Sequence, residues 1–161
     1  MPASSHLYAN GELDREIVLS RVINARRELV WRAWTESGRM FQWFGPRGFH
    51  CEVRQQGEAK VGAVWRFDMI APDGHRFDSR MTFLEIVPNE KLVLDHSSDK
   101  DDDPDRFRVT ITFDGYGDDK TLLTLRQIHP NKARRTEVIA FGAVELGYQT
   151  LDKLGEYLAK G

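Results

Sequence analysis

The chain has 161 residues, a net charge of −2 from 23 basic and 25 acidic side chains, and one cysteine. This length suits a single domain with its own hydrophobic core, and the balanced charge excludes the basic surface that is typical of nucleic-acid binding. The lone Cys51 excludes an internal disulfide, and no apolar run reaches the roughly 20 residues that cross a bilayer. We therefore expect a cytoplasmic protein with no signal peptide, no membrane span and no nucleic-acid partner.

The N-terminal residues 1–15 are mostly small and polar, which predicts a flexible arm. Residues 16–161 are expected to form one domain, because the sequence has no internal repeat and no second core pattern. The first strand is predicted from Glu16 to Val22, where branched aliphatic side chains are frequent.

Two short helices are expected after this strand. Asn24 is predicted to cap the first helix, over residues 26–34. The second helix starts near Glu36 and must end at Gly45-Pro46, because proline lacks the amide that another helical turn would use.

The two predicted helices carry an unusual density of aromatic side chains. Residues 31–49 contain three of the four tryptophans of the chain. A cluster of this size either fills a core or forms the wall of a cavity for an apolar ligand. We expect Trp31 and Trp34 to pack in the core, and Trp43 and Phe44 to lie near the mouth of a cavity.

From Phe49 to Ile128 the apolar residues alternate with polar ones, which predicts six consecutive antiparallel strands, each with one apolar face. The sequences Pro72-Asp73-Gly74 and Pro88-Asn89-Glu90 are typical turns. The aspartate-rich stretch Ser97–Asp105 is expected to be a solvated hairpin loop.

The last segment, from about Asn131 to Lys160, is predicted to be a long helix. Gly142 and Gly147 interrupt its pattern, and each glycine costs a helix about 1 kcal/mol relative to alanine. We expect this cost to be offset by close packing at these positions or by space left for a ligand. Seven strands and a long covering helix form an α+β fold.

Five segments of the chain resemble, in the same order, the activator of heat-shock protein 90 ATPase (AHSA-type) family of the START-like, or SRPBCC, helix-grip superfamily. The segments are VWRAWTESGRMFQWFGPRG (30–48), GAVWRFDMIAPDG (62–74), FLEIVPNEKLVL (83–94), VTITFDGYGDDKTLLTLRQ (109–127) and LGYQTLDKLGEYL (146–158). The resemblance implies a seven-stranded curved antiparallel sheet wrapped around a long C-terminal helix, with two short helices between strands 1 and 2. It also implies an apolar cavity between the sheet and that helix.

The resemblance leaves three functions open, because a fold alone does not choose among them. The leading hypothesis is binding of a small hydrophobic or aromatic ligand in the cavity, for transport, sensing or sequestration. The alternatives are a cyclase or hydrolase-type enzyme that uses the same cavity, and a stress-related co-chaperone whose partner is a heat-shock ATPase. No cofactor and no metal are expected, since none of the five histidines has ligand spacing. A homodimer remains an option.

Ligand contacts are expected from the aromatic strand faces and from the last helix. The expected ligand-contacting residues are Trp43, Phe44, Trp65, Phe67, Met69, Phe83, Phe113, Phe141, Glu145 and Tyr148. His96 and Arg126 are further polar candidates for the cavity. In the enzyme alternative, Glu145 or His96 would act as the acid or base.

Overall fold

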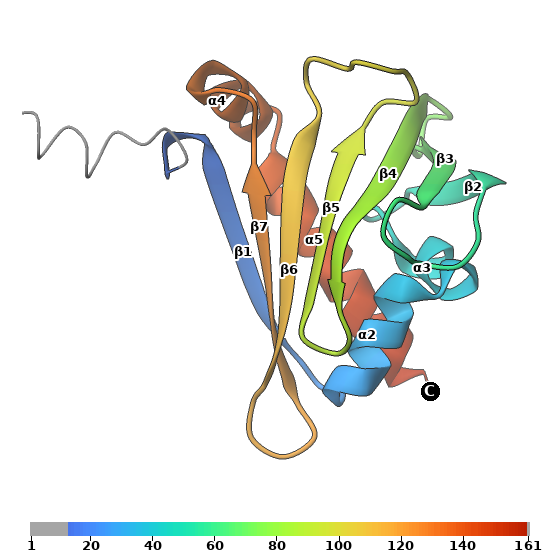
Figure 1. Ribbon diagram of the computed structural model, residues 1–161, viewed down its shortest axis with the longest axis vertical. Coiled ribbons are helices and arrows are strands. Elements are labelled where there is room, and N and C mark those ends of the chain that lie inside the picture. The colour runs from blue at the N-terminus through green and yellow to red at the C-terminus, as the bar shows by residue number, and fades with distance from the viewer. Residues whose placement is uncertain (1–12, 161) are drawn as a thin grey trace, which may run out of the picture.

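The computed structural model describes residues 13–160, so residues 1–12 of the predicted arm lie outside the described part. The described chain forms a seven-stranded sheet and four α-helices, preceded by one 3₁₀ turn (Figure 1). In chain order the elements are η1 (Leu13–Arg15), β1 (Glu16–Ile23), α2 (Arg27–Thr35), α3 (Ser37–Trp43), β2 (His50–Gln55), β3 (Val64–Ile70), β4 (Arg76–Val87), β5 (Lys91–Ser97), β6 (Phe107–Gly115), β7 (Thr121–Ile128), α4 (Lys132–Ala140) and α5 (Ala143–Ala159).

All neighbouring strands are antiparallel, in the order β1-β7-β6-β5-β4-β3-β2. The strands β2 to β7 form a continuous meander. The strand β1 pairs with β7, so β1 and β2 are the two edge strands of the sheet. Figure 1 shows α5 crossing one face of the curved sheet, with α2 and α3 beside it near β4. The predicted α+β helix-grip fold is therefore confirmed.

The hydrophobic core lies between this inner face and the helices. Successive residues of a strand point to opposite faces, and Trp65 and Phe67 of β3 are accordingly buried in the core, with Phe83 of β4. The helix α5 contributes Leu151 and Leu154, both fully buried. No helix among residues 13–160 is long and apolar enough to cross a membrane.

The two short helices form where the sequence predicts them, but the predicted cap is wrong. The residue before α2 is Arg26, and no side chain caps this helix. The chain turns tightly after β1, where the Ala25 amide donates to the Ile23 carbonyl, so the helix begins too late for Asn24 to cap it. After α3, the Lys153 ammonium of α5 donates to the carbonyls of Pro46 and Phe49 (3.1 and 3.2 Å) and holds the returning chain against the helix.

The predicted C-terminal helix is divided into two. Gly142 adopts a left-handed conformation, with φ of 90°, between the end of α4 and the start of α5. A residue with a side chain is strained in this conformation, which explains the glycine. In Figure 1, α4 lies beyond one end of the sheet, whereas α5 crosses its face. Of these two helices, α5 contributes fully buried side chains to the core, whereas Val138 and Ile139 of α4 pack against it only half-buried.

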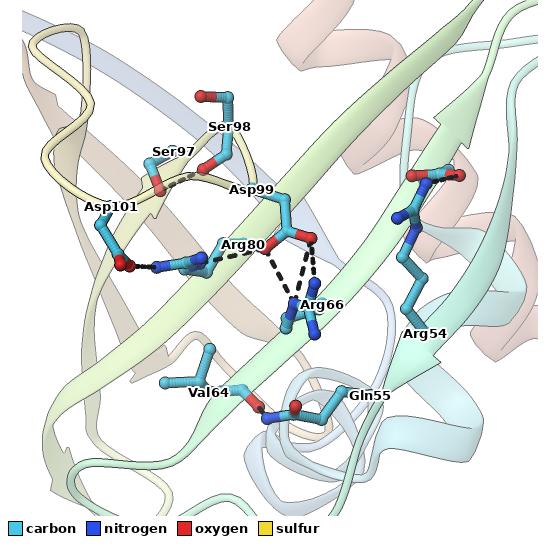
Figure 2. Close-up of polar contacts among 10 residues, drawn as sticks. Arg54, Gln55, Val64, Arg66, Arg80, Ser97, Ser98, Asp99 and Asp101 are labelled. Atoms are coloured by element: carbon cyan, nitrogen blue, oxygen red, sulfur yellow. Dashed lines mark hydrogen bonds and ion pairs between the residues drawn. The ribbon is translucent and has the colours of Figure 1, made fainter.

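The aspartate-rich loop after β5 connects the hairpin of β5 and β6, as predicted, but it is anchored to the sheet and only partly solvated. Arg66 and Arg80 are direct cross-strand neighbours, and two like charges in such positions repel each other. Asp99 bridges them, accepting hydrogen bonds from both guanidinium groups at 2.7–3.1 Å. Figure 2 shows this carboxylate between the two arginines, with the helices behind the sheet. The loop thus folds over the outer face of the sheet.

The last residues of the predicted arm also make contacts with the domain. Leu13–Arg15 form the turn η1. The Arg15 guanidinium donates to the carbonyl of His129 at 3.1 Å, and the His129 amide donates to the Arg15 carbonyl at 2.9 Å. The N-terminal end of β1 is therefore joined to the end of β7.

Candidate functional site

A cavity of about 170 Å³ lies between α5 and the inner face of the sheet. Five residues of α5 form one wall, at the three- and four-residue spacing of a helix face: Ala143, Leu146, Gly147, Thr150 and Leu151. The strands β4 to β7 form the opposite wall with Met81, Leu94, His96, Phe107, Val109, Ile111, Leu125 and Gln127. Trp34, Phe44, Gly45, Pro46 and Met69 close one end.

The position of α5 explains why this space stays open. The helix contacts β1 on one side and α2 and α3 on the other, so it spans the middle of the curved sheet. At β1 the approach is so close that a Cβ atom on Gly147 would collide with Cδ1 of Leu19. The glycine therefore serves close packing, and the neighbouring small side chains of Ala143 and Thr150 leave the volume above the middle strands.

His96 is the titratable side chain of the cavity. Its imidazole lies among aromatic rings, with centroid distances of 5.1 Å to Phe107, 6.2 Å to Phe44 and 6.3 Å to Phe67. The side chain is half-buried and lines the cavity. Burial lowers the pKa of His96 to about 4, so the imidazole is neutral at pH 7.

Gln127 is the second polar side chain of the sheet wall. Its Oε1 lies 3.0 Å from Nε2 of His129, which is buried and stacks on Phe107 at a centroid distance of 4.8 Å. Burial, with the nearby charges of Arg134 and Arg135, lowers the pKa of His129 to about 4. The neutral His129 therefore donates through Nε2, and the Gln127 amide nitrogen makes no hydrogen bond to any residue in 13–160.

The residues that were predicted to contact a ligand divide between the cavity and the core. Phe44 and Met69 line the cavity. The aromatic side chains of the strands, Trp65, Phe67, Phe83 and Phe113, are fully buried and pack against other rings instead. Neighbouring aromatic side chains fill the volume that a ligand would need at these positions.

Trp43 and Trp34 both lie in the core. Trp43, which was expected near the mouth of the cavity, is buried, and its Nε1 donates to the Ala33 carbonyl at 3.1 Å. Trp34 packs in the core as predicted and also lines the cavity. The two indoles meet edge to face at 4.8 Å, so Trp43 supports Trp34 from behind.

Four expected polar or aromatic positions do not face the cavity. Phe141 is 77% exposed, in the break between α4 and α5, and Glu145 is exposed on α5. Tyr148 packs under the Arg21 guanidinium at the β1 edge, 3.9 Å from its ring centroid. Arg126 points to the outer face of the sheet and pairs with Glu16.

The strand residues that line the cavity but were not predicted to contact a ligand are mainly aliphatic. Leu94, Val109, Ile111 and Leu125 follow the same alternation as the aromatic positions. Their pattern predicts an inward-facing side chain, but aliphatic residues are also the usual filling of a core. The helix residues could have been found from Gly147, because positions three and four residues away share its face.

Other features of the described chain are less suited to ligand binding. A larger surface groove, of about 840 Å³, lies beside α3, but it is lined by the charged side chains of Glu36, Arg39 and Glu58. Burial raises the pKa of the Cys51 thiol to about 12, so the thiol stays protonated at neutral pH and is a poor nucleophile. Among residues 13–160, no three histidine, cysteine or carboxylate side chains converge as in a metal site.

Solved structures with similar folds come from several bacteria. Protein CV1439 from Chromobacterium violaceum is 26% identical, with a TM-score of 0.73, and the match covers 88% of this chain and 95% of that chain. A protein from Arthrobacter aurescens has a TM-score of 0.82 at 16% identity, covering 92% and 88%. Protein NE0264 from Nitrosomonas europaea has a TM-score of 0.77 at 21% identity, covering 91% and 96%. No curated protein matches the sequence significantly.

The sequence pattern of one protein family matches residues 24–159, which include α2, α3, α5 and six of the seven strands. The family is described as "Activator of Hsp90 ATPase homolog 1-like protein". Its match covers the residues that form the cavity, and the helix-grip fold is shared with the similar structures. The chain therefore belongs to the Activator of Hsp90 ATPase homolog 1-like protein family.

Proposed function

We propose that the protein binds a small apolar or aromatic molecule in the cavity beneath α5, and that it carries, senses or sequesters this molecule. The observation that carries the proposal is the composition of the cavity wall. Most of its side chains are aliphatic or aromatic, and the polar side-chain atoms come from His96, Gln127, Thr150 and the indole nitrogen of Trp34. An apolar pocket with a few polar groups is the usual form of a small-molecule site.

The size of the cavity limits the ligand. A volume of about 170 Å³ is close to that of an engineered apolar cavity of about 150 Å³ that binds benzene. Pockets for larger ligands usually have roughly 300–1,000 Å³. We infer a ligand with the size of one aromatic ring, since a long lipid chain would require α5 to move away from the sheet.

Access to the cavity is expected beside Leu146. This side chain lines the cavity and is also 37% exposed, so it separates the cavity from solvent. A rotation of one exposed leucine is a fast motion that costs little free energy. The fixed side of the entrance is the Gly45-Pro46 turn, whose Pro46 carbonyl is held by Lys153.

A cavity-filling variant tests the proposal with toluene as the probe. Ala143→Leu adds a branched side chain inside the cavity, whereas Ala133→Leu adds the same side chain on the exposed face of α4. We expect toluene to raise the melting temperature of the wild-type protein and of Ala133→Leu, with saturable amide NMR shifts at cavity residues. Ala143→Leu should lose both effects. A wild-type protein without saturable shifts at these residues would refute the proposal.

A further inference from the structure

Three side chains of the cavity have unmet hydrogen-bonding capacity, namely His96, Gln127 and Trp34, and His96 is the one that can both donate and accept. A neutral imidazole has one N–H donor and one nitrogen acceptor. His96 makes no hydrogen bond to any residue in 13–160, and three phenylalanine rings surround it. His96 is half-buried, and polar groups that are held away from bulk water are nearly always hydrogen-bonded. A partner from outside the chain would meet this need.

The position of His96 makes it accessible to a molecule in the cavity. His96 lies opposite Met81 on β4 and Phe107 on β6, so strands flank it on both sides. Phe44 contacts it from the end of α3, and its side chain lines the cavity. A molecule that occupies the cavity can therefore bring a polar atom to the imidazole.

The remainder of the wall limits the charge of that molecule. All the residues that line the cavity lie in the described part of the chain, and none of them is an aspartate, glutamate, lysine or arginine. A charged ligand would lose its hydration without gaining an ionic partner, which costs much more than the transfer of a neutral one. The wall therefore favours a neutral ligand.

Building on the proposed function, we propose that the cavity takes a neutral single-ring aromatic molecule with one hydroxyl or carbonyl group, and that His96 binds this group. The ring lies between α5 and the aliphatic side chains of Leu94, Val109 and Ile111. The imidazole offers a donor to a carbonyl group, and a donor or an acceptor to a hydroxyl. His96 is thus the residue that determines specificity within an otherwise apolar site.

Gln127 gives the polar end of the cavity a second donor. It lies on β7, with Val109 of β6 directly opposite it, and His129 holds its Oε1. Its side chain lines the cavity, and its amide nitrogen makes no hydrogen bond to any residue in 13–160. A ligand oxygen near His96 can also accept from this amide or from a water molecule bound to it.

Toluene and phenol form a matched pair of probes, because they share shape and size and differ in the hydroxyl group. Dissociation constants are measured for both by NMR titration, in the wild-type protein and in His96→Leu. We expect His96→Leu to weaken phenol binding at least tenfold and to change toluene binding less than twofold. The imidazole ¹⁵N resonances of His96 should shift with phenol and much less with toluene.

Two further variants control for changes in packing. Met81→Leu alters an adjacent apolar wall residue and should change both affinities by the same factor. His96→Gln keeps a donor and an acceptor and should preserve most of the phenol affinity. If toluene binds but His96→Leu changes both affinities equally, the role of His96 is refuted and the proposed function stands. If neither probe binds the wild-type protein, both proposals are refuted.

Discussion

Gly147 of α5 and Leu19 of β1 lie so close together that a Cβ atom on residue 147 would collide with Cδ1 of Leu19. This contact sets the distance between the helix and the edge of the sheet. It also explains a glycine in the middle of a helix, where glycine is unfavourable. The close approach at β1 and the open cavity over the middle strands are two consequences of the same helix position.

The two glycines of α5 should respond oppositely to alanine. Gly155→Ala introduces a Cβ with nothing within 4 Å, so the gain in helix propensity should raise the free energy of unfolding by about 0.5–1 kcal/mol. Gly147→Ala forces the buried Leu19 to move and should lower it by about 1 kcal/mol or more. Urea unfolding measures both changes, and equal stabilisation by the two variants would contradict the close contact.

Asp99 should contribute much more to stability than its neighbour Asp101. Asp99 is bridged by Arg66 and Arg80 with its side chain 4% exposed, whereas the side chain of Asp101 is 90% exposed. We expect Asp99→Asn to cost about 2 kcal/mol, because two arginines lose their charged acceptor. Asp101→Asn should cost at most about 0.5 kcal/mol.

The effect of Asp99→Asn should also depend on pH. The Arg66 guanidinium holds the pKa of Asp99 below its ordinary value. A lowered carboxyl pKa stabilises the fold above the pKa of the unfolded state, and this contribution is lost as the carboxylate becomes protonated. The stability difference between the wild-type protein and Asp99→Asn should therefore shrink below about pH 4. A difference that stays constant in acid would contradict the ionic role.

The stability of the fold should fall as the pH is lowered from about 6.5 to about 4. Burial lowers the pKa of His96 and of His129 to about 4 in the folded protein, so the unfolded chain binds more protons in this range. Each such histidine adds a slope of up to about 1.4 kcal/mol per pH unit. His96→Leu should make the measured slope shallower, and His96→Leu combined with His129→Leu should make it shallower still. An unchanged slope in both variants would refute the buried neutral state.

Lys153 should stabilise the end wall of the cavity. Its ammonium donates to the Pro46 and Phe49 carbonyls, so Lys153→Met removes two hydrogen bonds from the segment after α3. We expect faster amide hydrogen exchange in residues 44–49 and a loss of about 1–2 kcal/mol. Lys160→Met, at the exposed end of α5, is the matched control and should change neither quantity.

The fold could be predicted from the sequence because local pattern and overall topology agree. The alternation of apolar and polar residues predicted the six strands between Phe49 and Ile128. The Gly45-Pro46 pair predicted the end of α3. The break at Gly142 was visible only as an unfavourable helix residue, since a left-handed φ is decided by the chain on both sides of it.

The site was harder to predict than the fold, because the identity of a residue does not show whether its neighbours fill the space around it. Trp65 and Phe67 pack against Phe83 and Phe41, respectively, and these pairings depend on how the strands and α3 come together. The small residues Ala143 and Thr150 of α5 line the cavity, and a pattern of large apolar side chains does not reveal such positions. The anchoring of Asp99 depends on the cross-strand register of Arg66 and Arg80, which a single sequence does not determine.

A crystal structure of the protein in the presence of phenol would show whether the cavity binds a single aromatic ring and whether His96 binds its hydroxyl group. We expect one ring in the cavity between α5 and strands β4 to β7, with the hydroxyl oxygen about 2.7–3.2 Å from an imidazole nitrogen of His96. The ring should contact Leu94, Val109 and Gly147. A cavity closed by its own side chains, with phenol bound only elsewhere on the protein, would refute the proposed ligand site.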